Sequence, residues 1–217
     1  MNFTPGDTQT LLDIMRSRRD VRGKSFLATP LEEEKIELIL QAALAAPSVG
    51  YSQPWEFILI DDETIKEKIH KNFCCENEKA KEIFAEKEKY RELKLEGIRE
   101  APLNIAVLYS PQKKPVLGTT SMQKMGEYSV VCAIENMWLM ARSLDIGMGW
   151  VSILNEKSVL NTLKAPPQKQ LIAYLCLGYV SSFASEPELK TLKWEKEKQR
   201  SELLHRNRYN NSSSSKP

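Results

Sequence analysis

Hydrophobic residues recur along the chain with two different spacings, and the change from one to the other predicts the secondary structure. Helical spacing marks residues 8–17, 29–46, 65–73 and 128–144, and the second of these opens on a Thr-Pro-Leu-Glu capping pattern at Thr29. Short runs rich in β-branched and aromatic residues predict strands at 55–60, 103–109, 147–153 and 171–180. Helices first, with strands scattered between them, indicate an α+β fold, because an α/β sandwich would show tighter strand and helix alternation.

Two stretches depart from this pattern. Between residues 76 and 100 nearly every second residue is charged and the apolar stripe is thin, which predicts a largely solvated helix or a mobile cover. Beyond Ser181 the chain becomes polar, and it ends in a run rich in Asn and Ser. We therefore expect one domain over 1–204, followed by a disordered tail over 205–217.

Composition narrows the classes of function. The 217 residues carry a net charge of +2, so no overall field would gather nucleic acid or an anionic membrane, and an anion must be held by a local cluster. No apolar run is long enough to span a bilayer and the start lacks a signal-peptide layout, which predicts a cytoplasmic protein. The four cysteines and two histidines lack metal-ligand spacing, so we expect reduced thiols and no metal site.

The densest chemical feature is a group of four arginines at the end of the first predicted helix: Arg16, Arg18, Arg19 and Arg22. Guanidinium groups bind phosphate through paired N–H donors, so this cluster is a candidate phosphate site. The alternative is that the cations complement the negative end of the helix dipole. Asp20 lies inside the cluster, where it could relay a proton or could pair structurally with Arg18 or Arg22.

Two further segments could contact a ligand. A loop of small, polar and rigid residues over 46–55 carries Ser48 and Gln53, which could meet a heteroaromatic group. Gly147 and Gly149 indicate a place where the backbone approaches something closely, and Ser152 follows them. The chain has no dinucleotide or phosphate-loop glycine motif and no plausible Ser-His-Asp set. Phosphate donors with few acids or bases therefore predict that a bound cofactor carries the reaction.

The chain carries five motifs that resemble those of the nitroreductase-like flavoproteins, in the same order, between Arg16 and Trp194. Within this family, the resemblance is strongest to the branch of 5,6-dimethylbenzimidazole synthases, the BluB enzymes. The motifs are Arg-Arg-Asp-Val-Arg, Ala-Pro-Ser-Val-Gly with Gln-Pro-Trp, Lys-Leu-Glu-Gly-Ile-Arg-Glu-Ala-Pro-Leu-Asn from Lys94, Tyr-Ser-Val-Val-Cys-Ala-Ile from Tyr128, and Gly-Trp-Val-Ser-Ile-Leu from Gly149. The resemblance implies a homodimer with a mostly antiparallel central sheet and FMN at the subunit interface.

The same resemblance implies an unusual activity, in which FMN is the substrate. Reduced FMN would react with molecular oxygen, and its ring system would be broken down to 5,6-dimethylbenzimidazole, the lower ligand of cobalamin, with erythrose 4-phosphate as the sugar fragment. A separate reductase that uses NAD(P)H would supply the reduced flavin. The charged segment 76–100 would be a lid over the flavin.

The resemblance also assigns roles to residues. Asp20 would relay protons, and Ser152 would hydrogen-bond near the reacting edge of the flavin. The implied flavin contacts are Arg18, Arg19, Asp20, Val21, Arg22, Ser48, Gln53, Leu117, Gly118, Ser152 and Arg200. Thr119 departs from the family pattern, which predicts an Arg there.

Two alternatives remain open at this point. A conventional nitroreductase or flavin reductase would keep FMN bound and pass hydride from NAD(P)H to an external acceptor, which requires open space above the flavin. A non-catalytic flavin-binding protein would explain the scarcity of acids and bases.

Overall fold

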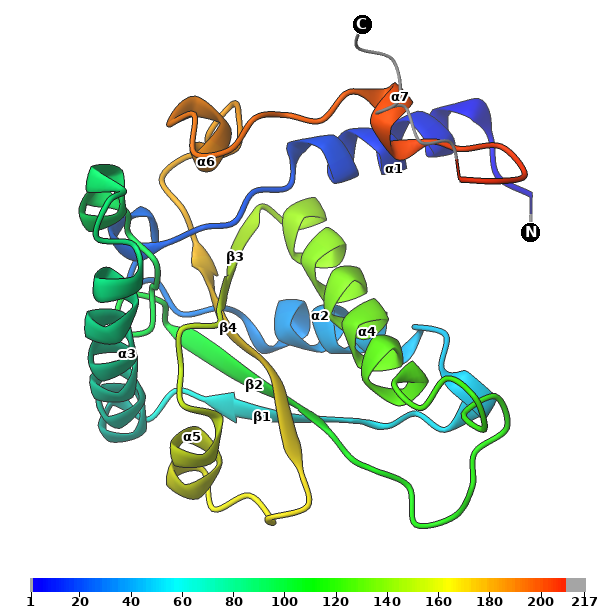
Figure 1. Cartoon of the computed structure of the whole chain (residues 1–217), viewed down its shortest axis with the longest axis horizontal. Helices are drawn as coiled ribbons and strands as arrows, with labels where there is room; N and C mark the ends of the chain where they lie inside the picture. Colours follow the sequence, from blue (N-terminus) through cyan, green and yellow to red (C-terminus); the bar gives the residue numbers. More distant parts are fainter. Residues whose placement is uncertain (1, 210–217) are drawn as a thin grey trace, which may run out of the picture. The chain divides into compact units, whose positions relative to one another are not determined.

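The computed structural model describes residues 2–209, and its centre is one antiparallel sheet with helices on both faces (Figure 1). The strands are β1 (Trp55–Ile60), β2 (Leu103–Tyr109), β3 (Ile146–Val151) and β4 (Gln170–Tyr179), in the order β1-β2-β4-β3. Every neighbouring pair in this sheet is antiparallel. The α+β class and the four predicted strands are confirmed, although β3 ends two residues before the predicted position.

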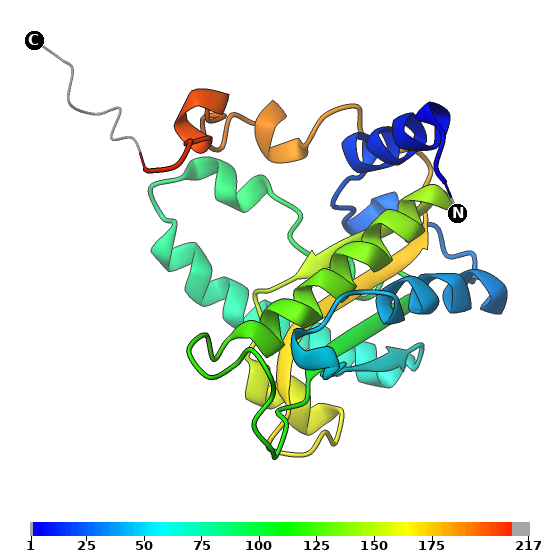
Figure 2. The same cartoon turned by 90° about the vertical axis from the view of Figure 1, so that its right-hand side faces the viewer.

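Four helices form the layers on the two faces of the sheet. Helices α2 (Glu33–Leu44) and α4 (Met125–Ser143) pack on one face, and α3 (Glu63–Ile83) and α5 (Glu156–Thr162) pack on the other (Figures 1 and 2). Helix α1 (Pro5–Ser17) contacts α4 and buries none of its own residues. Three short 3₁₀ turns, η1 (Gly23–Ser25), η2 (Val49–Tyr51) and η3 (Glu88–Glu92), lie in the connections.

The core follows the two-residue period of the strands. In β4, Leu175 and Leu177 pack toward α2 and α4, whereas Tyr174 and Cys176 pack toward α3. Helix α4 is buried over a wide arc that includes Ile134 and other apolar residues, so the predicted central helix is confirmed.

Two helices begin at residues other than the predicted ones. Helix α1 starts at Pro5, three residues early, because Thr4 and Asp7 form a capping box. Helix α2 starts at Glu33, and its N-cap is Glu32 rather than Thr29. The Glu32 carboxylate accepts a hydrogen bond from the Tyr179 hydroxyl of β4, so it is not available to close the predicted capping box.

The charged segment 76–100 divides into two parts. Helix α3 continues unbroken to Ile83, so the first part is helical as predicted. The second part has no helix beyond the short turn η3, and Ile98 is fully buried in the core on the α3 face. Asn104 of β2 donates a hydrogen bond of 2.8 Å to the Ile98 carbonyl. The prediction of a solvated helix is therefore wrong for the residues after 92.

The contacts within the chain define a second compact unit that starts at Ala184, and this unit is described by itself. It contains the short helices α6 (Glu188–Thr191) and α7 (Arg200–Leu203). Residues 210–217 of the predicted disordered tail lie outside the described residues, and the predicted domain end at residue 204 stays a prediction. Between residues 2 and 209, no helix combines the length and the apolar composition needed to cross a bilayer.

Candidate active site

The arginine segment, residues 16–22, leaves α1 and runs beside β3. The Val21 N–H donates a hydrogen bond of 3.0 Å to the Met148 carbonyl. The backbone of Asp20 forms an isolated parallel β-bridge with the same residue, Met148. Gly149 makes this approach possible, since a Cβ atom there would lie 2.1 Å from the Val21 carbonyl oxygen. The close approach predicted for the glycines is confirmed, and the segment that approaches them is the chain's own arginine segment.

Asp20 fixes the arginine segment to β3. Its Oδ1 accepts a hydrogen bond of 3.2 Å from the Trp150 N–H, and its Oδ2 accepts one of 2.8 Å from Nε of Arg22. The structural pairing with Arg22, one of the two alternatives for Asp20, is therefore present. The Asp20 side chain still keeps 33% of its surface exposed, so a ligand can reach the carboxylate.

The remaining arginines have different surroundings. Arg19 folds back on the end of α1, where its Nη1 donates to the carbonyls of Arg16 (2.7 Å) and Arg18 (2.6 Å), which is the helix-end role that the sequence left open. The Arg18 guanidinium stacks 4.7 Å from the centre of the Trp138 ring. Among residues 2–209 it has no hydrogen-bond or ion-pair partner. Arg18 therefore offers its N–H donors to an anion.

Ser152 lies at the same end of β3. It directly follows the strand, is exposed, and is two residues from Trp150, whose N–H binds Asp20. The structure thus places Ser152 in the neighbourhood of Asp20 and Arg22. The Val21 side chain differs, because it is buried in the core on the α3 face and presents no side-chain atoms to a surface ligand.

Ser48 and Gln53 lie in a loop over residues 48–54 near the start of α4. Positive φ angles occur at three of its residues, Gly50, Tyr51 and Gln53. Such a backbone is strained and persists only where the surroundings hold it. Two hydrogen bonds do so: the Val49 N–H donates to Ser129 Oγ of α4 (3.0 Å), and the Gln53 N–H donates to Ser48 Oγ (3.1 Å).

A turn over residues 116–119 packs on this loop. A Cβ atom at Gly50 would lie 2.8 Å from the Leu117 carbonyl oxygen, and one at Gly118 would lie 3.0 Å from the Val49 side chain. Thr119 stands where the resemblance predicted Arg. Its Oγ1 donates a hydrogen bond of 2.8 Å to the Val116 carbonyl and so closes the turn. The structure therefore brings the predicted contacts Leu117 and Gly118 together with Ser48 and Gln53.

The predicted site residues form two groups at opposite ends of α4. We call residues 16–22 with β3 and Ser152 the arginine end, and residues 48–54 with 116–119 the loop end. Ser129 holds the loop end, and Trp138 holds the arginine end, since its Nε1–H donates 3.3 Å to the Arg19 carbonyl. Along α4, Trp138 lies nine positions after Ser129, a rise of about 14 Å between the two anchors. Arg200 belongs to the second unit, so its predicted contact stays a prediction.

Sequence reasoning missed both anchors on α4. The pattern assigned Trp138 to the core because it falls on the apolar face of a buried helix. Its indole N–H, however, donates to the Arg19 carbonyl, and its ring packs against the Arg18 guanidinium. Ser129 is 5% exposed and was detectable only as a polar residue on that same buried helix.

A buried thiol lies directly behind the arginine end. Cys176 of β4 is paired with Gly149 and is completely buried. Burial raises the pKa of the Cys176 thiol, a backbone hydrogen bond from Gly97 opposes this, and the nearby carboxylates of Glu96 and Asp20 add to the rise. Cys176 therefore stays protonated and acts as a packing residue.

Comparison with known proteins identifies the class of protein. Residues 15–179 match the model of the nitroreductase family, and the chain belongs to this family. It is 39% identical over 197 residues to the 5,6-dimethylbenzimidazole synthase of Rhodospirillum rubrum, a match that covers 89% of this chain and 92% of the relative. It is 35% identical over 199 residues to the synthase of Rhodobacter capsulatus, with 90% and 95% covered.

A solved structure shows the same fold. An FMN-dependent nitroreductase from Clostridium difficile superposes with a TM-score of 0.63 at 23% identity, over 91% of this chain and 99% of that one. Together with the family match, this confirms the predicted nitroreductase-like fold.

Proposed function

We propose that this protein is a 5,6-dimethylbenzimidazole synthase, which fragments reduced FMN in the presence of molecular oxygen and releases erythrose 4-phosphate. The observation that carries the proposal is the similarity to proteins of that name: three such relatives are 33% to 39% identical over about nine-tenths of this chain. The product would serve as the lower ligand of cobalamin. A separate NAD(P)H-dependent reductase supplies the reduced flavin, and the low number of acids and bases around the site fits a reaction in which the protein mainly positions its substrate.

The donors in the structure fit FMN. The Arg18 guanidinium lacks a partner among the described residues, and a phosphate dianion accepts two parallel N–H bonds from such a group. At the loop end, the exposed Gln53 amide and the Ser48 hydroxyl suit the polar edge of a heteroaromatic ring. Reduced FMN, when bound, supplies both the electrons that oxygen accepts and the carbon atoms of the product.

The way in which Asp20 and Ser152 are held supports the roles that we propose for them. Both Asp20 oxygens accept hydrogen bonds from the protein, so its carboxylate stays in one place while it takes up and returns protons. Ser152 has an exposed hydroxyl at the same end and donates a hydrogen bond to the reacting edge. Neither residue has to move, which suits a reaction that depends on positioning.

A homodimer is part of the proposal. The loop end is surrounded by large apolar side chains that the single chain leaves exposed, among them Tyr51 (84% exposed), Leu117 (86%) and Tyr128. A second copy that covers this face would also bring its own loop end toward the arginine end of the first chain. Two FMN sites per dimer, each made from both chains, would result. The segment 76–100 then covers the flavin, with Ile98 anchoring its end in the core.

The test supplies the reactants directly. Protein is mixed anaerobically with reduced FMN, oxygen is admitted without NAD(P)H, and 5,6-dimethylbenzimidazole is sought by mass spectrometry. Formation of the product supports the synthase. If only oxidised FMN and peroxide appear, the proposal fails, and NAD(P)H-dependent reduction of an added acceptor would then identify a nitroreductase. The substitutions Asp20→Asn and Ser152→Ala should keep FMN binding and abolish product, whereas a flavin-binding protein would be unaffected.

A further inference from the structure

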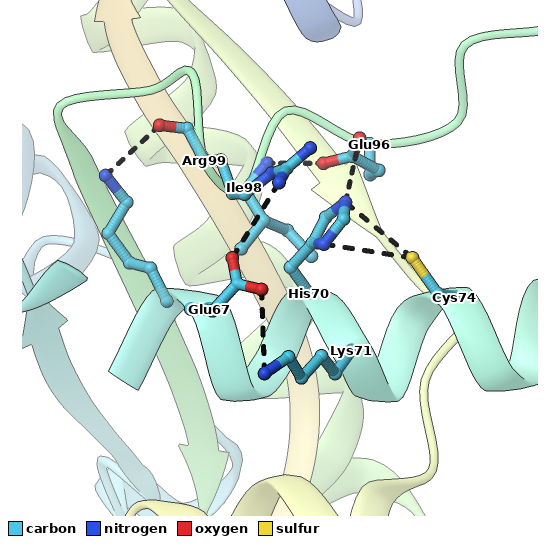
Figure 3. Close-up of polar contacts among 8 residues, drawn as sticks. Glu67, His70, Lys71, Cys74, Glu96, Ile98 and Arg99 are labelled. Atoms are coloured by element: carbon cyan, nitrogen blue, oxygen red, sulfur yellow. Dashed lines mark hydrogen bonds and ion pairs between the residues drawn. The ribbon is translucent and has the colours of Figure 1, made fainter. Parts of the chain in front are cut away.

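A second cluster of reactive groups lies where the segment after η3 meets α3, and it shares no residue with the arginine end or the loop end (Figure 3). His70 and Cys74 are one helical turn apart, and Cys74 Sγ lies 3.8 Å from Nδ1 and 3.8 Å from Nε2 of the imidazole. Nε2 lies 3.8 Å from Oε1 of Glu96, which comes from the segment after η3. The imidazole therefore stands between a thiol and a carboxylate.

The exposure of these three groups decreases in the order thiol, imidazole, carboxylate. Cys74 is exposed, the His70 side chain keeps 14% of its surface accessible and that of Glu96 keeps 7%. The other carboxylate oxygen of Glu96 accepts a hydrogen bond of 2.8 Å from the Ile98 N–H, which holds the carboxylate in place. A buried, fixed carboxylate stabilises a protonated imidazole more than an exposed one does, because the surroundings screen the charges less. The thiol is thus the most accessible of the three groups.

We propose that Cys74 is a peroxide-reactive thiol, with His70 as its base and Glu96 as the residue that stabilises the protonated imidazole. His70 takes the thiol proton, and the thiolate sulfur attacks one oxygen of hydrogen peroxide. The S–O bond forms as the O–O bond breaks, and the leaving hydroxide takes the proton back from His70 and departs as water. Sulfur loses two electrons, peroxide gains them, and the product is cysteine sulfenic acid.

Peroxide suits this cluster better than a metal ion does. Among residues 2–209, no three His, Cys, Asp or Glu side chains are placed to hold a metal together. Reduced flavin that meets oxygen without going on to product releases hydrogen peroxide, so the proposed function would generate the oxidant on the same protein. Only this source of hydrogen peroxide depends on the proposed function. The reactivity of Cys74 rests on the geometry alone.

The chain contains its own controls. Cys75 is the next residue and is also exposed. It has the ammonium of Lys79 as its charged neighbour but no imidazole partner among the described residues. It therefore tests whether exposure and a nearby cation are enough for reaction. Cys176 is completely buried, so it becomes accessible only if the protein unfolds. Cys132 is less suitable, because it lies exposed on α4, which the proposed dimer would cover.

The experiment compares two single substitutions in the full chain. Cys75→Ser leaves Cys74, and Cys74→Ser leaves Cys75; each protein is treated with hydrogen peroxide and a dione that traps sulfenic acid, and the labelled peptides are quantified by mass spectrometry. We expect Cys74 to react at least about tenfold faster than Cys75. Adding His70→Asn to Cys75→Ser should lower the rate at Cys74 to that of Cys75. Glu96→Gln should give an intermediate rate.

Equal rates at Cys74 and Cys75 would overturn the proposal, and this comparison needs no change at His70. An unchanged Cys74 rate in the His70→Asn protein would overturn it as well. Labelling of Cys176 reports unfolding; if His70→Asn unfolds the protein, His70→Gln replaces it under the same criterion. Because peroxide is added from outside, a failed synthase assay does not affect the outcome.

Discussion

Three of the four arginines that stand together in the sequence have different surroundings in the structure. Arg19 binds the carbonyls at the end of α1, and Arg22 is paired with Asp20. Arg18 stacks on Trp138 and has no polar partner for its guanidinium among the described residues. This cluster of like charges therefore offers Arg18 as its main anion donor, while Arg19 and Arg22 hold the segment in place.

This difference gives a prediction for Arg18→Ala. The substitution should weaken FMN binding by about 10- to 100-fold, the loss expected when a charged hydrogen-bond donor is removed. Riboflavin has the same ring system without the phosphate, so its binding should change by less than about twofold. Both affinities can be measured by flavin fluorescence titration. Arg16→Ala removes the same charge from the exposed end of α1 and is the matched control. Equal weakening of both flavins would contradict the assignment of Arg18 to the phosphate.

Buried Cys176 and Tyr174 give a prediction for alkaline pH. Burial raises the pKa of both groups above their ordinary values of 9.0 and 10.0, so in this range the folded protein keeps protons that the unfolded chain releases. The free energy of unfolding should then fall by about 1.4 kcal/mol per pH unit because of Cys176 as pH rises above 9, and by about the same further amount because of Tyr174 above pH 10. Below pH 9 the folded and unfolded thiols are both protonated, and Cys176 contributes no slope.

Urea denaturation at pH 8 to 11 tests this prediction. Cys176→Ala should reduce the alkaline slope by about 1.4 kcal/mol per pH unit, whatever the substitution does to stability at pH 8. Cys75→Ser removes an exposed thiol and should leave the slope as it is. An unchanged slope in Cys176→Ala would show that other groups cause the alkaline loss.

At the scale of elements, the sequence predicted what depends on local periodicity. The four strands and α4 have strong patterns, and the structure has them within a few residues of the predicted bounds. The start of α2 and the residues after 92 were predicted wrongly, because distant contacts decide them. The Tyr179 hydroxyl of β4 donates a hydrogen bond to the Glu32 carboxylate, and the Asn104 amide of β2 donates one to the Ile98 carbonyl. Neither contact can be predicted from the spacing of apolar residues.

The contact between the arginine segment and β3 is the element pairing on which the site depends most. Gly149→Ala would place a methyl group 2.1 Å from the Val21 carbonyl oxygen, so backbone must shift. We expect the free energy of unfolding to fall by about 1 to 3 kcal/mol and Asp20 to lose its fixed position. Thermal denaturation and the product assay measure the two effects. In Gly6→Ala, the matched control, the nearest atom lies 3.6 Å away, and stability should not decrease. Equal stability of the two variants would contradict the tight contact.

At the scale of the whole molecule, the motifs identified site residues but not their arrangement. Ser48, Gln53, Asp20 and Ser152 could be named from sequence because each lies in a short recognisable stretch. That they fall into two groups, one near each end of α4, could not be predicted. Helix α4 anchors each group through a residue, Ser129 or Trp138, that has the sequence pattern of a core residue.

The separation of the two ends predicts complementation between inactive variants. Ser152→Ala damages the arginine end, and Gly50→Val damages the loop end by forcing a side chain against the Leu117 backbone. If each flavin site uses the arginine end of one chain and the loop end of the other, mixed dimers contain one intact site. After mixing and reassociation, about a quarter of the wild-type rate of product formation should return. Activity no higher than the average of the two separate variants would mean that both ends act within one chain.

The separation of the two ends along α4 has a further consequence for the cell that makes this protein. In the proposed dimer, each flavin is held by the arginine end of one chain and the loop end of the other, so a single chain completes no site. The unit that folds would then be smaller than the unit that consumes FMN. A newly made or highly diluted chain would leave the flavin pool intact, and consumption of the vitamin would begin only where two chains have found each other.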